Sequence, residues 1–194
     1  MRRWRVQTGE PMLVWLDDGR GLPLWRPGDA RLVRDAFAEW SAAGLPLRFA
    51  FTSDSAAAAI RVQWVTCLSG ARAGVTYRIA GPGGWISTAD IRIALARSDG
   101  TPQSGRVMRA IALHEIGHAL GLAHSAVPDD IMAPLVEATA LTEHDRVAAR
   151  LLYAFAMPPR WRRTTDPVPA ASRGGPPRGA THCTSRALGC STRD

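Results

Sequence analysis

The sequence predicts a single α+β domain with five strands, two long helices and a shorter helix near its C-terminal end. Three observations support this fold class: five short apolar or alternating runs lie between turn-forming residues, two long segments have helical character, and the end of the chain lacks core-forming side chains. A chain of 194 residues can bury one sizeable core. We therefore assign the folded domain to residues 1–157 and expect a disordered basic tail over residues 158–194.

The expected strands are short runs that are either continuously apolar or alternate between apolar and polar residues. Ile60–Val65 has the clearest alternation, and Asp17-Asp18-Gly19 is a turn signal directly after the first run. Glycine-rich stretches bracket the fourth run. The five expected strands are residues 11–16, 45–51, 60–65, 75–79 and 86–95.

The first expected helix covers about residues 30–43, where Phe37 and Trp40 belong to one apolar face at three- and four-residue spacing. Asp29 is placed to cap this helix and Gly44 to end it. The helix should cover one side of the sheet.

A second helix is expected over residues 107–120, and it is apolar on nearly every side, which is typical of a buried helix. Thr142 and Asp145 are three residues apart and approximate a capping box. A last helix should therefore start here and continue through Tyr153.

Most of the net charge of +7 lies in the tail, which carries +5 and is rich in Pro, Gly, Ser, Thr and Arg. Such a composition cannot bury enough apolar surface to offset its ordering entropy. The body of the protein is nearly neutral, so nucleic-acid binding is not expected. No apolar run approaches the roughly 20 residues needed to span a bilayer, which argues against a membrane-spanning protein.

The cysteines and the N-terminal residues say little about the compartment. Cys67, Cys183 and Cys190 form no zinc-knuckle pattern, and their odd number leaves at least one unpaired, although a Cys183–Cys190 bridge remains open. Residues 1–5 are charged like the start of a signal peptide, but polar residues 7–10 follow where an apolar stretch should begin. No secretion signal is visible, and a cytoplasmic location, another export route or a longer precursor all remain open.

The chemistry-bearing motif is the run His114-Glu115-Ile116-Gly117-His118, which is followed by Gly121 and His124. His114 and His118 are four residues apart on a predicted helix, so both imidazoles project from one face toward one metal ion. Gly121 favours a sharp turn at the helix end, and this turn can return His124 as a third ligand. Three neutral imidazoles on Zn²⁺ leave a fourth position for water, with Glu115 beside it as a base.

The alternative is that these are ordinary core histidines. Burying two imidazoles and a carboxylate in an apolar helix without partners would cost several kcal/mol, whereas a metal and its water would satisfy them. The spacing therefore favours a zinc site that hydrolyses amides.

Around this motif, the sequence resembles the metzincin clan of zinc peptidases, and within it the matrixins. The features that carry the resemblance are His114–Ser125, then Val127-Pro128 and Ile131–Pro134, with Met132 eight residues past His124. The resemblance implies a zincin-like fold: a twisted, mixed five-stranded sheet with one antiparallel edge strand, packed on two long helices, and a C-terminal helix after the Met-turn. It covers about residues 11–155. It also implies that Met132 lies under the zinc site; the alternative, that Met132 is plain core, is less favoured because its position after the three-histidine motif matches the Met-turn.

The resemblance further implies that a peptide substrate adds as a strand to the sheet edge at Gly74–Ile79, although this could be an ordinary edge strand. Pro134 and Leu135 would wall the pocket for the residue after the cut. The candidate substrate-binding residues are therefore Gly74, Val75, Thr76, Tyr77, Pro134 and Leu135.

The chain departs from the matrixin pattern in two respects. Residues 66–90 contain no histidine and only Asp90 as an acid, so one catalytic zinc is expected, without the family's structural zinc and calcium ions. A Pro-Arg-Cys-Gly cysteine switch is missing from the sequence. His144 and His182 are expected to be surface histidines. By resemblance we expect secretion or an extracytoplasmic location and a monomer.

The leading hypothesis is a zinc metalloendopeptidase that acts on proteins or peptides with a zinc-bound water activated by Glu115. One alternative is a catalytically idle, zinc-stabilised module that binds peptides, and Glu115 argues against it because a binder needs no base. Another is a different hydrolase or a metal-dependent nuclease with convergent spacing, against which Ser125 and Met132 argue.

Overall fold

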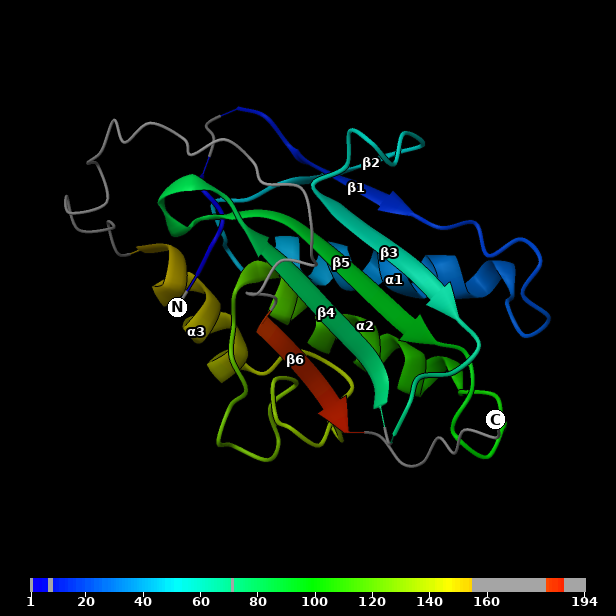
Figure 1. The fold of residues 1–194 in the computed structure, drawn as a ribbon. Coiled ribbons are helices and arrows are strands. Elements are labelled where there is room, and N and C mark those ends of the chain that lie inside the picture. Colours follow the sequence, from blue (N-terminus) through cyan, green and yellow to red (C-terminus); the bar gives the residue numbers. More distant parts are fainter. Residues whose placement is uncertain (1, 7–8, 71, 155–180, 187–194) are drawn as a thin grey trace, which may run out of the picture.

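A mixed β-sheet backed by helices on one face forms the body of the protein (Figure 1). The computed structural model describes residues 2–6, 9–70, 72–154 and 181–186. The strands are β1 (Met12–Leu16), β2 (Phe49–Thr52), β3 (Ile60–Val65), β4 (Arg72–Ala80), β5 (Ile86–Ala94) and β6 (Thr181–Arg186), in the order β2-β1-β3-β5-β4-β6. A 3-10 turn, η1 (Pro82–Gly84), joins β4 to β5.

The five predicted strands are all present, and their pairing confirms the predicted fold class. β1 is parallel to β2 and β3, and β3 is parallel to β5, whereas β4 runs antiparallel to β5. The alternation in Ile60–Val65 has its expected consequence, because Ile60, Val62 and Trp64 are buried while the residues between them are less so. One of these, Arg61, makes a bidentate ion pair with Asp90 of β5.

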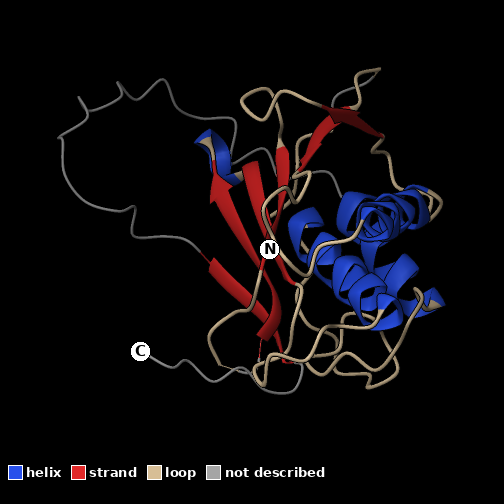
Figure 2. Ribbon diagram, turned by 90° about the vertical axis from the view of Figure 1, so that its right-hand side faces the viewer, coloured by secondary structure: helices blue, strands red, loops and turns tan. Residues whose placement is uncertain are grey.

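Three helices accompany the sheet: α1 (Pro27–Ser41), α2 (Gly105–Leu120) and α3 (Glu143–Ala154). Figure 2 shows the helices gathered on one side of the strands. α2 packs against β4 and β5 as well as against α1, where Trp40 Nε1 donates to the Leu113 carbonyl at 2.9 Å. α2 is therefore enclosed, which agrees with the burial of Met108 and of all residues from 110 to 120.

The predicted start of α1 was wrong by three residues. Asp29 is not its cap but its third residue, and its carboxylate accepts from the backbone N–H of Arg26 at 2.8 Å. Pro27 begins the helix instead, because its fixed φ suits the first helical turn, where its missing N–H costs nothing. At the start of α3, Thr142 and Asp145 do form the predicted reciprocal capping box.

The tail differs from its predicted disorder at one place. Thr181–Arg186 form β6, which pairs antiparallel with β4. The physical reason is that β4 would otherwise be an edge strand with unpaired N–H and C=O groups, and a short segment of Thr, Cys and Ser can satisfy them. The rest of the predicted tail, residues 158–180 and 187–194, lies outside the described residues.

No helix in the described part of the chain is long and apolar enough to cross a membrane.

Candidate metal centre and catalytic site

Helix α2 carries three of the four chemistry-bearing residues. His114, Glu115 and His118 lie in its last two turns, and the side chains of all three are fully buried. The helix stops at Gly121, whose φ of 112° is in the left-handed region. A side chain here would be strained, and its Cβ would lie 2.3 Å from the carbonyl oxygen of Arg2. The turn at Gly121 leads the chain back toward the histidines, to His124.

Backbone carbonyls fix the ring orientation of both buried histidines. His114 Nδ1 is 2.7 Å from the carbonyl oxygen of Ile131, and His118 Nδ1 is 3.0 Å from that of Leu122. A carbonyl oxygen can only accept, so each Nδ1 carries the hydrogen and each Nε2 presents a lone pair. Within the described part of the chain, neither Nε2 has a hydrogen-bond partner, although both are buried.

His124 completes a cluster with these two rings. Its ring centre is 5.3 Å from that of His114 and 4.8 Å from that of His118. One nitrogen of each histidine lies within 4.8 Å of the others, close enough to hold a metal ion. Two buried, partnerless lone pairs that converge with a third imidazole fit Zn²⁺, because neutral histidine nitrogens are among its preferred ligands.

Burial also sets the protonation state that a metal needs. Loss of solvent lowers the pKa of His114 to about 4, although the bond to Ile131 opposes this. Burial, followed by the neighbouring His114, lowers the pKa of His118 well below its usual range. Both rings are therefore neutral near pH 7 and can act as ligands.

Strand β4 holds the Glu115 side chain in place. Thr76 Oγ1 lies 2.6 Å from Glu115 Oε2 and 3.0 Å from the Glu115 carbonyl oxygen. Gly74 faces the same carboxylate, and a Cβ at Gly74 would lie 2.6 Å from Glu115 Oε1. The family resemblance implies that Gly74 and Thr76 bind substrate, and in the structure both lie against Glu115.

The loop that carries Met132 is anchored to both α2 and α3. The backbone N–H of Ser125 donates to the Met132 carbonyl at 2.8 Å, and a Cβ at Gly117 would lie 2.3 Å from Met132 Sδ. From α3, Asp145 accepts from the backbone N–H groups of Ile131 at 2.9 Å and Met132 at 3.2 Å. Sequence reasoning identified Asp145 as a capping residue but missed this contact, because nothing local pairs it with residues 131 and 132.

A second carboxylate, Asp130, ties the loop after His124 to α3. It is 1% exposed and accepts hydrogen bonds from Ser125 Oγ, Thr142 Oγ1 and His144 Nδ1. Burial raises its pKa, but these three bonds together outweigh burial and hold the pKa below its usual range. His144 is 58% exposed, as expected, but it is bonded to Asp130, which raises its pKa.

The other four predicted substrate residues differ in their exposure to solvent. Val75 is buried and Tyr77 half-buried on β4, whereas Pro134 and Leu135 are exposed. A pocket of about 200 Å³ borders the three-histidine cluster and includes His124 and Met132 in its lining, but not Pro134 or Leu135.

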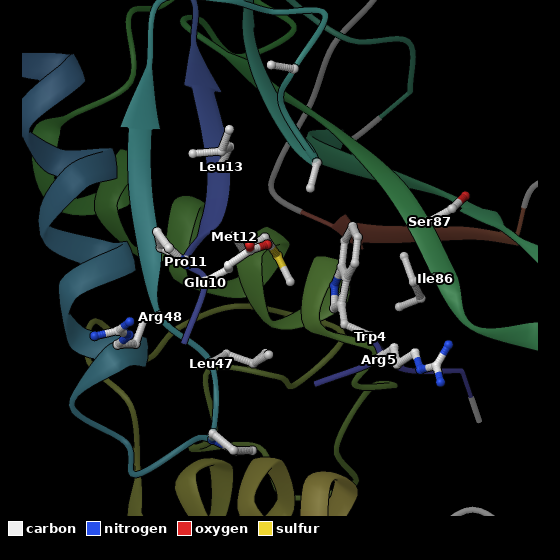
Figure 3. Close-up of a pocket in the computed structure, with 13 residues that line it drawn as sticks. Trp4, Arg5, Glu10, Pro11, Met12, Leu13, Leu47, Arg48, Ile86 and Ser87 are labelled. Atoms are coloured by element: carbon white, nitrogen blue, oxygen red, sulfur yellow. The ribbon is translucent and has the colours of Figure 1, made fainter. Parts of the chain in front are cut away.

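A larger pocket, of about 380 Å³, lies between the N-terminal segment and the sheet (Figure 3). Trp4, Met12 and Ile86 contribute to its walls, and none of the three histidines does. The pocket has no cluster of metal-ligating side chains among the described residues. Of these two pockets, only the smaller one borders the three-histidine cluster.

Comparison with known proteins agrees with this geometry. The profile of the family described as Matrixin matches residues 26–154, which is most of the chain and includes α2, the Met132 loop and α3. The chain belongs to the matrixin family. Matrixins are zinc-dependent endopeptidases, which act on proteins or peptides and are generally extracellular.

This matrixin is also similar to Matrix metalloproteinase-2 of Drosophila melanogaster, with 49% identity over 47 residues. The aligned part is 22% of this chain and 6% of the relative. The chain thus matches only a small part of that protein's length.

Proposed function

We propose that this matrixin is an active zinc endopeptidase, in which His114, His118 and His124 hold one catalytic zinc ion and Glu115 is the general base. The observation that carries the proposal is the pair of buried Nε2 atoms of His114 and His118, which have no partner among the described residues. Leaving two such acceptors unsatisfied would cost free energy that a metal ion recovers. When bound, zinc lowers the pKa of a water molecule and polarises the scissile carbonyl.

Glu115 has the position that a base requires. It follows His114 directly in α2, so its carboxylate lies beside the ligand nitrogens. It takes the proton of the attacking water and passes it to the departing amine, which is the ordinary work of a general acid–base group. An idle peptide-binding module would have no use for a buried carboxylate held at this point.

The outer edge of β4 is the proposed docking site for the peptide. β6 pairs with residues 72–78 of this edge in an antiparallel direction, so the edge accepts an extended chain. Backbone groups of Gly74, Val75, Thr76 and Tyr77 would hold the substrate. Pro134 and Leu135 are exposed two and three residues after Met132, and they would contact the residue that follows the cut.

The test compares two variants that should fail differently. Glu115→Gln is expected to retain zinc and fold and to lose about 10²–10⁴-fold in the rate of casein hydrolysis, because an amide cannot accept the proton. His118→Ala is expected to lose the metal itself. A Glu115→Gln protein with near wild-type activity would contradict the mechanism, and a zinc-loaded wild-type protein without any hydrolysis would favour the idle binding module.

The metal content, extent and setting of the domain follow from the same proposal. Metal analysis of dialysed protein is expected to give one zinc ion per chain without structural zinc or calcium, and two zinc ions would contradict the interpretation of residues 66–90.

We place the C-terminal end of the catalytic domain near residue 157, just after α3 ends at Ala154. We further propose a monomer that acts outside the cytoplasm, which gel filtration and cell fractionation would test.

A further inference from the structure

Thr76 is a polar side chain in the interior of a sheet. It is fully buried in β4, where a hydroxyl without a partner would be costly. Its two neighbours within hydrogen-bond distance are the Glu115 carbonyl at 3.0 Å and Glu115 Oε2 at 2.6 Å. A carbonyl oxygen and an ionised carboxylate oxygen can only accept, so with Glu115 ionised, as a general base must be, the single hydroxyl proton of Thr76 goes to one of them. The shorter distance and the charge of the carboxylate favour Glu115 Oε2.

The other side of the carboxylate is bounded by the strand backbone. A Cβ at Gly74 would lie 2.6 Å from both Glu115 Cγ and Glu115 Oε1. β4 therefore places the Thr76 hydroxyl group at Glu115 Oε2 and the backbone of Gly74, which has no side chain, beside Glu115 Oε1. A glutamate side chain has three rotatable bonds, and these two contacts hold its end in one orientation relative to the histidines of α2.

On the basis of the proposed function, we propose that Thr76 is a positioning residue for the general base Glu115, acting through its hydroxyl group. It does not contact the substrate through its side chain, because that side chain is buried against α2. The orientation of the carboxylate affects only the chemical step. Loss of the Thr76 hydroxyl group should therefore lower kcat and leave KM unchanged.

The test replaces the hydroxyl with a methyl group of the same size. Thr76→Val is expected to lower kcat on a synthetic peptide by about 10- to 100-fold with KM and zinc content unchanged, since one bond to a charged group is lost. Thr76→Ser keeps the hydroxyl and should recover most of the rate. Thr88→Val is the matched control: Thr88 Oγ1 is buried on β5 and has no hydrogen-bond partner among the described residues.

The outcomes separate this inference from the proposed function. Hydrolysis by the wild-type protein tests the function, whereas the Val and Ser pair tests Thr76. An unchanged kcat in Thr76→Val, or equal losses in Thr76→Val and Thr88→Val, would overturn the positioning role. A double-mutant cycle of Thr76→Val and Glu115→Ala, measured by urea unfolding, needs no activity, and additive effects would contradict the contact itself.

A separate observation concerns what covers the outer edge of β4. β6 lies beside β4 and near α2, at the end of the sheet that carries the site (Figure 1). In the antiparallel register, Cys183 is the partner of Thr76 and Ser185 is the partner of Gly74. The two β4 residues that contact Glu115 are therefore both paired with the tail.

From this register we infer that β6 is an internal occupant of the peptide-binding edge, which a substrate must displace. An added strand satisfies the same N–H and C=O groups that a peptide would use. Because β6 belongs to the same chain, its effective concentration at the edge does not fall on dilution. The tail thereby competes with every substrate and weakens its apparent binding. This inference rests on the proposed use of the β4 edge.

The test weakens β6 in the full chain. Thr184→Pro removes the backbone N–H opposite Val75, and proline is poorly tolerated inside a paired strand. Ser172→Pro changes the tail outside β6 and is the matched control. Thr184→Pro is expected to lower the KM for a peptide by several-fold with little change in kcat, and to speed hydrogen exchange at amides of residues 72–78.

A synthetic peptide with the sequence of residues 180–187 completes the experiment. It should inhibit Thr184→Pro competitively and the wild-type protein more weakly, since the internal strand already fills the edge. Equal KM values and equal exchange rates in wild type, Thr184→Pro and Ser172→Pro would overturn the inference. Hydrogen exchange does not require hydrolysis, so failure of the proposed function would show as inactivity with the exchange difference intact.

Discussion

Asp145 joins the last helix to the three-histidine cluster, and Asp145→Ala should damage both the stability and the proposed zinc affinity of this matrixin. Its carboxylate is 1% exposed. It accepts from the backbone N–H groups of Ile131 at 2.9 Å, Met132 at 3.2 Å and Thr142 at 2.9 Å. The carbonyl of the same Ile131 receives Nδ1–H of His114. The chain of contacts therefore runs from α3 through the Ile131–Met132 peptide unit to His114, a proposed metal ligand.

The expected magnitude comes from the groups that would lose their acceptor. Alanine leaves three backbone N–H groups without a partner; those of Ile131 and Met132 are buried. Each unsatisfied buried group costs roughly 1–3 kcal/mol, and water entering the vacated space recovers a part of it. We expect a loss of about 3–5 kcal/mol in the free energy of unfolding, a large share of the ~5–15 kcal/mol that holds a typical domain together. Loosening the partner of His114 should also weaken zinc binding by about tenfold.

Urea unfolding of zinc-free and zinc-loaded protein measures the first effect, and competition with a chromogenic chelator measures the second. Asp129→Ala is the matched control, because Asp129 is an exposed aspartate in the same loop. A loss of less than about 1 kcal/mol in the free energy of unfolding of Asp145→Ala, no more than a surface substitution such as the control, would contradict this role of Asp145. Normal stability with weakened zinc binding would instead mean that the loop reorganises at little cost.

Three further predictions follow from the same contacts. Gly74→Ala is expected to keep zinc but lose most hydrolysis, because the added Cβ would lie 2.6 Å from Glu115 Oε1; retained kcat would show that β4 can shift. The bond to Asp130 raises the pKa of His144, so NMR titration should give a value above 6.5. The stabilisation from this pair is complete below the unfolded-state pKa and is lost as pH rises through the raised pKa, so the stability difference between wild type and His144→Asn should shrink over that range. Chelation of zinc should lower the thermal midpoint, because a ligand at about 100 times its Kd contributes about 2.7 kcal/mol, and an unchanged midpoint in calorimetry would contradict a resident metal.

The features that could be predicted from the sequence depend on residues that are close together in the chain. The spacing of His114 and His118 depends only on the helical repeat, and the position of Gly121 depends only on the need for a left-handed residue at the helix end. The Thr142–Asp145 capping box is likewise closed within one turn. Such features involve neighbours in sequence, so the residues themselves carry the information.

What only the tertiary structure decided involves partners that are distant in sequence. Thr76 is 39 residues from Glu115, and Ile131 is 17 residues from His114, so no periodicity links them. The strand at Thr181–Arg186 was missed because its short polar sequence has no apolar pattern, and it is ordered by the open edge of β4 and not by burial of its own core. The sequence by itself predicted the candidate zinc ligands, the candidate base and the family, since these require residue types at fixed spacing, and the match to the matrixin profile confirms the family. The tertiary structure decided what holds Glu115 in place and what covers the strand edge beside it, because both depend on which strands the fold brings together.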